Sequence, residues 1–220
     1  MATLPKDNGY VNLTARDHHV LKAYVAHPAG APQGVIVLLQ QRDRRDPDHQ
    51  IQRSLRAAGG SSLPGVNAFA RQMALRFAQS GFAVIAPSTF GRGRNSSERC
   101  YAFEPGPHGL RLKLPLEPLD SQGVMQDVEA ALLYARHLAP HAHVGVVGYC
   151  WGGLLAWQAA SRFRMVRAAA CHYGGGMELP QERERQPLAP VLAHWPDDPR
   201  WMRPDGIEAF IAQTQAQGPQ

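Results

Sequence analysis

The chain of 220 residues is 44% hydrophobic and 19% charged, which is enough apolar material for one substantial core. Its formal net charge is +5, but the arginines are scattered and no basic stripe interleaved with aromatic residues is present, so we expect no nucleic acid partner. No apolar run reaches about 18 residues and the N-terminus has no signal-peptide pattern, so we expect a cytoplasmic protein without a membrane segment.

The chain alternates strand-like and helix-like segments. The patterns predict a hairpin of half-buried strands in 12–28, a buried strand in 34–40, a helix in 67–81 and a buried strand in 82–87. They then predict a helix in 121–140, a strand in 144–149, a helix in 152–163, strands in 166–173 and 189–195, and a helix in 205–215. This alternation implies parallel βαβ units, and therefore a mostly parallel, doubly wound sheet with helices on both faces in a single domain spanning 1–220.

Two stretches interrupt the alternation. Residues 42–64 are charged and then rich in Gly and Ser, where a strand and its following helix are usually joined by two to six residues, so we expect an inserted loop there. Residues 91–120 are rich in Gly, Pro and Arg, and we expect an irregular excursion over the carboxyl edge of the sheet. Loops at this edge are where α/β proteins hold ligands.

The three cysteines are Cys100, Cys150 and Cys171. They form no CxxC pair and have no regularly spaced histidine partners, so reduced thiols and no structural metal are expected.

The segment Gly148-Tyr149-Cys150-Trp151-Gly152 follows a predicted strand and opens a predicted helix. A nucleophile on such a sharp turn needs neighbours without a Cβ atom, which Gly148 and Gly152 supply. The helix N-terminus offers backbone N–H groups and a positive dipole end, which lower the pKa of a thiol and stabilise an oxyanion. The pattern therefore indicates that Cys150 is a nucleophile, although a buried structural cysteine is the competing interpretation.

The sequence resembles the dienelactone hydrolase family over nearly its whole length, because segments typical of the family occur in the family's order. The segments that carry the resemblance are GVIVLLQQ, GVNAFARQMALRFAQSGFAVIAPSTFGR, DVEAALLYARHLAP, VGVVGYCWGG, CHYGGG and PVLAHW. The resemblance implies an α/β-hydrolase fold and hydrolysis of an ester or lactone through an acyl-Cys150 intermediate, with no metal or cofactor. It further implies that Trp151 donates an oxyanion-hole N–H and that Arg92 binds the carboxylate of a small anionic substrate.

The sequence departs from the family pattern at several of these positions. Family members carry a glutamate where this chain has Gln41, and an amide cannot take a proton from sulfur, so Gln41 is left as a substrate-binding candidate. The insert begins directly after it, where the family supplies its second oxyanion N–H. The acid of the triad is expected just past the strand in 189–195, at Asp198, with Asp197 as the alternative.

The triad histidine should follow the acid, yet no histidine follows His194. By resemblance, a last strand carrying this histidine and a closing helix would be missing after Gln220. His172 and His194 are expected to be packed residues, and neither is assigned as a base. Loss of the base lowers the rate by about a thousandfold or more, so we expect an impaired enzyme. An uncovered sheet edge would favour a homodimer.

Two other functions remain open from the sequence. The chain could be a non-catalytic binding protein that keeps the pocket of the hydrolase, which Gln41 and the absent histidine would explain. It could also use Cys150 as a redox-sensitive thiol, although no resolving cysteine is identifiable.

Overall fold

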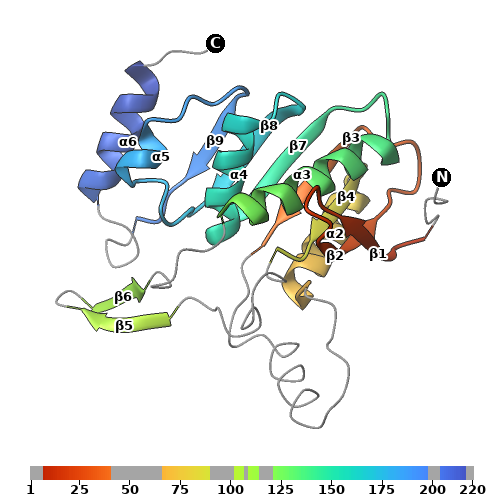
Figure 1. Cartoon of the computed structure of the whole chain (residues 1–220), viewed down its shortest axis with the longest axis horizontal. Coiled ribbons are helices and arrows are strands. Elements are labelled where there is room, and N and C mark those ends of the chain that lie inside the picture. The colour runs from red at the N-terminus through yellow and green to blue at the C-terminus, as the bar shows by residue number, and fades with distance from the viewer. Residues whose placement is uncertain are drawn as a thin grey trace, which may run out of the picture.

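The structure is a computed structural model that describes residues 7–40, 66–89, 121–197 and 204–216, together with the backbone of 102–106 and 109–113. Seven strands of the described chain form one sheet in the order β1-β2-β4-β3-β7-β8-β9 (Figure 1). They are β1 (Gly9–Thr14), β2 (Val20–Ala26), β3 (Gly34–Leu39), β4 (Phe82–Pro87), β7 (Val144–Tyr149), β8 (Val166–His172) and β9 (Val191–His194). The helices are α2 (Ala68–Gln79), α3 (Ser121–Leu138), α4 (Trp151–Arg162), α5 (Pro180–Arg183) and α6 (Pro204–Ala216).

Most of the sheet is parallel, as the alternation of strands and helices predicts. The predicted N-terminal hairpin is β1 and β2, which pair antiparallel, and β2 also pairs antiparallel with β4. From β4 through β3, β7 and β8 to β9 every neighbouring pair is parallel. All six residues of β3 are buried, which explains why this central strand is a continuous apolar run. The carboxyl ends of β3, β7, β8 and β9 consequently meet at one edge of the sheet.

Two apolar cores lie on opposite faces of the sheet. One forms where α2 packs on β2, β3 and β4, and its alanines Ala70, Ala74 and Ala78 lie one helical turn apart, which lets the helix approach the strands closely. The larger core lies under α3 and α4, which cross the other face of the sheet (Figure 1). The N-terminus of α2 is fixed because Asn67 Oδ1 accepts a hydrogen bond from the N–H of Ala70, at 2.8 Å.

The interruption at 91–120 contains regular structure that the sequence did not predict. Backbone segments β5 (Ala102–Gly106) and β6 (Gly109–Lys113) pair antiparallel in a separate two-stranded sheet, with Gly106 opposite Gly109. This antiparallel pairing of successive strands is a hairpin, where the sequence led us to expect an irregular excursion. The insert predicted at 42–64 lies outside the described residues.

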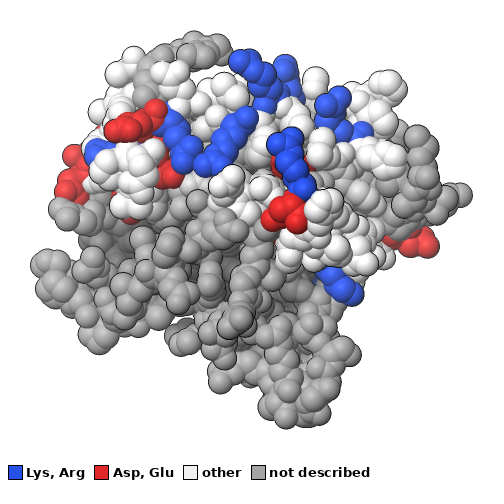
Figure 2. All heavy atoms as spheres, in the orientation of Figure 1, with Lys and Arg blue, Asp and Glu red and all other residues white. Residues whose placement is uncertain are grey.

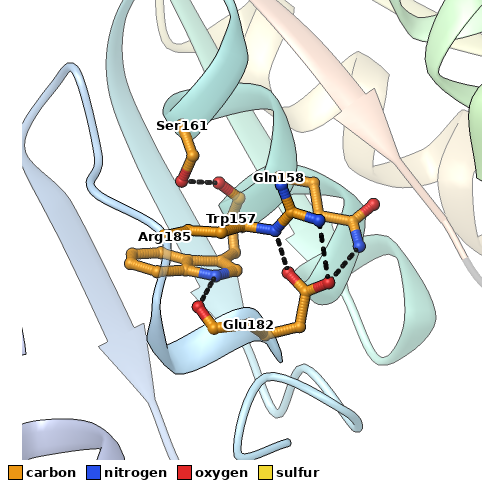
Figure 3. Close-up of polar contacts among 5 residues, drawn as sticks. All are labelled: Trp157, Gln158, Ser161, Glu182 and Arg185. Atoms are coloured by element: carbon orange, nitrogen blue, oxygen red, sulfur yellow. Dashed lines mark hydrogen bonds and ion pairs between the residues drawn. The ribbon is translucent and has the colours of Figure 1, made fainter. Parts of the chain in front are cut away.

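A buried polar network joins α4 to the short helix α5, which the sequence reading missed (Figure 3). The carboxylate of Glu182 is 5% exposed and accepts hydrogen bonds from Gln158 Nε2, at 2.8 Å, and from Arg185 Nε, at 2.6 Å. The indole N–H of Trp157 donates to the backbone oxygen of Glu182 at 3.1 Å. These contacts hold the segment that follows β8 against α4.

Removing the carboxylate of this network is predicted to destabilise the fold. In Glu182→Ala the amide of Gln158 and the guanidinium of Arg185 lose their acceptor in a mostly buried setting. We therefore expect the free energy of unfolding to fall by about 2 to 3 kcal/mol. Urea unfolding measures this change. The exposed neighbour Glu184→Ala is the control and should change the free energy of unfolding by less than about 0.5 kcal/mol; equal effects of the two variants would contradict the assignment.

Charged side chains of both signs lie on the face of the molecule that Figure 2 shows. Figure 2 shows lysine and arginine side chains separated by uncharged surface and accompanied by acidic groups. None of the helices in the described part of the chain combines the length and the apolarity needed to cross a bilayer.

Candidate active site

Cys150 occupies a sharp turn between β7 and α4. Its backbone has φ 53° and ψ −120°, a left-handed φ that a non-glycine residue rarely adopts. Its N–H donates to the carbonyl oxygen of His172 at 2.9 Å, and its own carbonyl accepts from the N–H of Gly153 at 2.8 Å. Both backbone groups are thus bonded in the strained conformation, which holds the residue at the junction of strand and helix.

Glycines on either side of Cys150 make this turn possible. A Cβ atom added to Gly148 would overlap the carbonyl oxygen of Gly152, and one added to Gly152 would overlap the carbonyl oxygen of Leu39 at the end of β3. The first turn of α4 therefore lies directly against the ends of two strands. This is the steric reason for the G-x-C-x-G spacing in the sequence, and the expected turn is confirmed.

Substituting one of these glycines is predicted to disrupt the turn. Gly152→Ala places a methyl group on backbone atoms of Leu39 and Gln40, which cannot move without distorting β3. We therefore expect the free energy of unfolding to fall by at least about 3 kcal/mol. Thermal unfolding measures the effect. Gly30→Ala is the control, since an added Cβ at Gly30 meets nothing within 4 Å. A melting temperature of Gly152→Ala equal to that of the unsubstituted chain would contradict the steric account.

The two described thiols lie in opposite environments. Cys150 is partly exposed, whereas Cys171 on β8 is 1% exposed, and burial raises the pKa of the Cys171 thiol to about 12. Cys171 is therefore protonated and unreactive near neutral pH. Cys171 is thus enclosed in the core, whereas Cys150 packs against the core and is partly exposed.

A row of rings crosses the carboxyl edge of the sheet beside Cys150. Tyr149, His172 and His194 are register partners at the ends of β7, β8 and β9. The rings of Tyr149 and His172 stack with centroids 4.6 Å apart, and those of His172 and His194 stack at the same separation. Phe69, at the start of α2, meets Tyr149 edge-on at 5.3 Å. The row forms an aromatic wall next to the candidate nucleophile.

The stack keeps His172 uncharged. Burial, and secondly the neighbouring His194, lower the pKa of His172 below the ordinary value of 6.5, because a charged imidazolium is poorly solvated there and is repelled by a second one. At pH 7 the ring is therefore neutral.

Removing the second ring of this pair is predicted to raise the pKa of His172. In His194→Gln the repulsion disappears but the burial remains, so the titration midpoint should move up while staying below the ordinary value. The ring-proton shifts in NMR spectra recorded against pH measure this. The exposed His143→Gln should leave the midpoint in place, and an unchanged midpoint in His194→Gln would refute the coupling.

The other predicted site residues are only partly within the described chain. Trp151 is the first residue of α4 and its side chain is 4% exposed. Asp197 follows β9 and is exposed. Gln41, Arg92 and Asp198 lie outside the described residues, so the structure does not distinguish Asp197 from Asp198. Within the ranges that the structure describes, no group of three or more His, Cys, Asp or Glu side chains could hold a metal ion.

The aromatic residues at this edge were not singled out by sequence reasoning. Tyr149 appeared only as the variable position of the glycine-flanked motif, and Tyr173 only as the end of a predicted strand. The position of Tyr149 could have been found, because it ends the parallel strand that leads directly to Cys150.

A mostly parallel sheet with this strand order and a strained turn between strand and helix at its carboxyl edge defines an α/β hydrolase. The sequence profile of the dienelactone hydrolase family matches residues 61–219. A carboxymethylenebutenolidase from Pseudomonas putida is 30% identical over 189 residues, covering 84% of this chain and 68% of that protein. The chain therefore belongs to the dienelactone hydrolase family.

Solved structures share the fold at lower sequence identity. An alpha-beta serine hydrolase homologue from Coxiella burnetii aligns with a TM-score of 0.61 at 11% identity, covering 96% of this chain and 85% of that one. A dienelactone hydrolase-like promiscuous phosphotriesterase from metagenomic libraries aligns with a TM-score of 0.60 at 17% identity, covering 97% of this chain and 79% of that one.

Proposed function

We propose that this chain hydrolyses a carboxylic ester or lactone with Cys150 as the nucleophile. The observation that carries the proposal is the backbone of Cys150, which is held at φ 53° between glycines whose absent Cβ atoms leave room for the turn. Strain of this kind persists where the surrounding structure enforces it, and it presents the side chain above the sheet edge. Membership of the dienelactone hydrolase family supports the reaction class.

The chemistry proceeds in two steps that together add one water molecule. The Cys150 thiolate adds to the carbonyl carbon, the carbonyl oxygen takes the negative charge, and the bond from carbon to the leaving oxygen then breaks as that oxygen gains a proton. Water next adds to the thioester, the carbon–sulfur bond breaks, and the carboxylic acid leaves as the thiol is restored. The N-terminus of α4 stabilises the oxyanion, with the N–H of Trp151 as its proposed donor.

We further propose that this chemistry is slow in the chain of 220 residues. Gln41 replaces the glutamate that the family uses to control its thiol, and an amide accepts no proton. His172 and His194, the histidines that the described residues bring to the candidate site, stack on one another, and both precede Asp197 and Asp198 in the chain. An acyl-Cys150 intermediate should therefore accumulate, because in this proposal no residue acts as the general base that activates the attacking water.

The proposed substrate is a small lactone or ester that carries a carboxylate. The Pseudomonas putida relative is named for a butenolide, an unsaturated lactone, with a carboxymethylene group. Arg92 is the proposed partner of the carboxylate, and Asp198, with Asp197 as the alternative, is the proposed acid of the site.

Acylation of Cys150 tests the proposal. After incubation with 4-nitrophenyl acetate at pH 6 to 9, mass spectrometry should locate one acetyl group on Cys150, and Cys150→Ala should abolish it. Cys171→Ala is the matched control and should leave acylation unchanged, because burial keeps that thiol protonated.

The same experiment separates the hydrolase from a binding protein. A non-catalytic protein would show neither an acetyl adduct nor release of 4-nitrophenol that depends on Cys150. That result at every pH from 6 to 9 would refute the proposed function.

A further inference from the structure

Tyr173 repeats the unusual backbone of Cys150 on the neighbouring strand. Three non-glycine residues in the described part of the chain have positive φ: His18, in the turn between β1 and β2, Cys150 at 53°, and Tyr173 at 41°. A left-handed conformation is rare for a bulky aromatic residue. Two strained residues thus lie at the same edge of the sheet.

Hydrogen bonds place these two residues side by side. The pairing of β7 with β8 continues past the strand ends, because the N–H of Cys150 donates to His172, the residue before Tyr173. The N–H of Tyr173 donates to the carbonyl oxygen of His194 at 2.7 Å, which continues the pairing of β8 with β9. Tyr173 is therefore fixed beside Cys150 where the strands end.

Close packing against α4 reinforces this position. The Cα atom of Gly174 lies 2.9 Å from where a Cβ atom of Gly153 would be, so the turn after Tyr173 touches the first turn of the nucleophile helix. A glycine at position 173 would adopt the left-handed backbone without strain, as Gly176 does three residues later at φ 102°. The strained position carries a tyrosine instead, which indicates that the side chain itself is used.

The side chain of Tyr173 combines a packed ring with an accessible surface. Its ring lies 6.2 Å from that of Tyr149 and 6.4 Å from that of His172, so it joins the aromatic wall. The residue nevertheless remains 45% exposed. A tyrosine held in this way offers a hydroxyl to a molecule bound over Cys150.

We propose that Tyr173 contacts the substrate, and that its phenol O–H donates a hydrogen bond to an oxygen of the acyl group that Cys150 attacks. The assignment rests on the proposed function for the identity of the acyl group. Three observations support it: the strained backbones of Cys150 and Tyr173, the hydrogen bonds that fix both residues, and the exposure of Tyr173.

The protonation state of the phenol agrees with this role. Burial raises the pKa of Tyr173 above its ordinary value of 10.0, and negative charge at Cys150 and then at Tyr149 raises it further. The phenol therefore stays protonated under conditions in which a thiolate forms, and it remains a donor. The influence of Cys150 also means that the two side chains are near enough for their charges to interact.

Removing only the hydroxyl tests the proposal. Tyr173→Phe should lower the rate of Cys150 acylation by 4-nitrophenyl acetate about tenfold, the value of one hydrogen bond to a developing charge. Alkylation of Cys150 by iodoacetamide reports the thiol itself and should stay within about twofold. Tyr134→Phe on α3 is the matched control, since burial raises the pKa of Tyr134 as well, and both rates should be unchanged.

Several results would overturn the assignment. Acylation that is unchanged in Tyr173→Phe would exclude a contact with the acyl group. Acylation and alkylation that fall equally would show that Tyr173 acts on the thiol and not on the substrate.

A second probe separates this proposal from the proposed function. Iodoacetate presents a carboxylate next to the carbon that Cys150 attacks, so Tyr173→Phe should lower the ratio of the iodoacetate to the iodoacetamide rate severalfold. If the wild-type chain is not acylated at all, the hydrolase proposal fails, while a lowered ratio still supports Tyr173 as a donor to oxygen. An unchanged ratio would refute it.

Discussion

The packing of α4 against the ends of β3 and β7 is the constraint on which the candidate site depends. Gly148 and Gly152 have no room for a Cβ atom, so the chain turns within one residue and that residue takes a left-handed backbone. The turn lies where the parallel strands β3 and β7 end beside each other. The backbone of Cys150 thus depends on the ends of two strands and not on the local motif alone.

The same arrangement explains why two cysteines of one sheet differ so strongly. Cys171 sits within β8 with its side chain in the core, where the thiolate is poorly solvated. Cys150 lies one residue past the end of β7, outside the alternation of the strand, and is partly exposed. The exposure of each thiol is therefore set by where its residue lies relative to the end of its strand.

Much of this fold could be predicted because apolar periodicity reports burial directly. The fully buried β3, the helix α2 and the turn at Cys150 could be predicted, since each leaves a recognisable pattern of residues in the sequence. Helix α5 was missed because four residues carry no periodicity, and it depends on the buried Glu182. Tyr173 could not be identified in advance, since its backbone angle arises from tertiary pairing with β9.

The near contact between Gly153 and Gly174 has a consequence for how a ligand is received. It holds the first turn of α4 against the turn after β8, so Cys150 and Tyr173 are expected to shift together and not independently. A binding surface that is already ordered loses little conformational entropy on association, and more of its contact energy remains as affinity. Under the proposed function, the choice of substrate should accordingly depend on the shape and polarity of the substrate more than on a rearrangement of the protein.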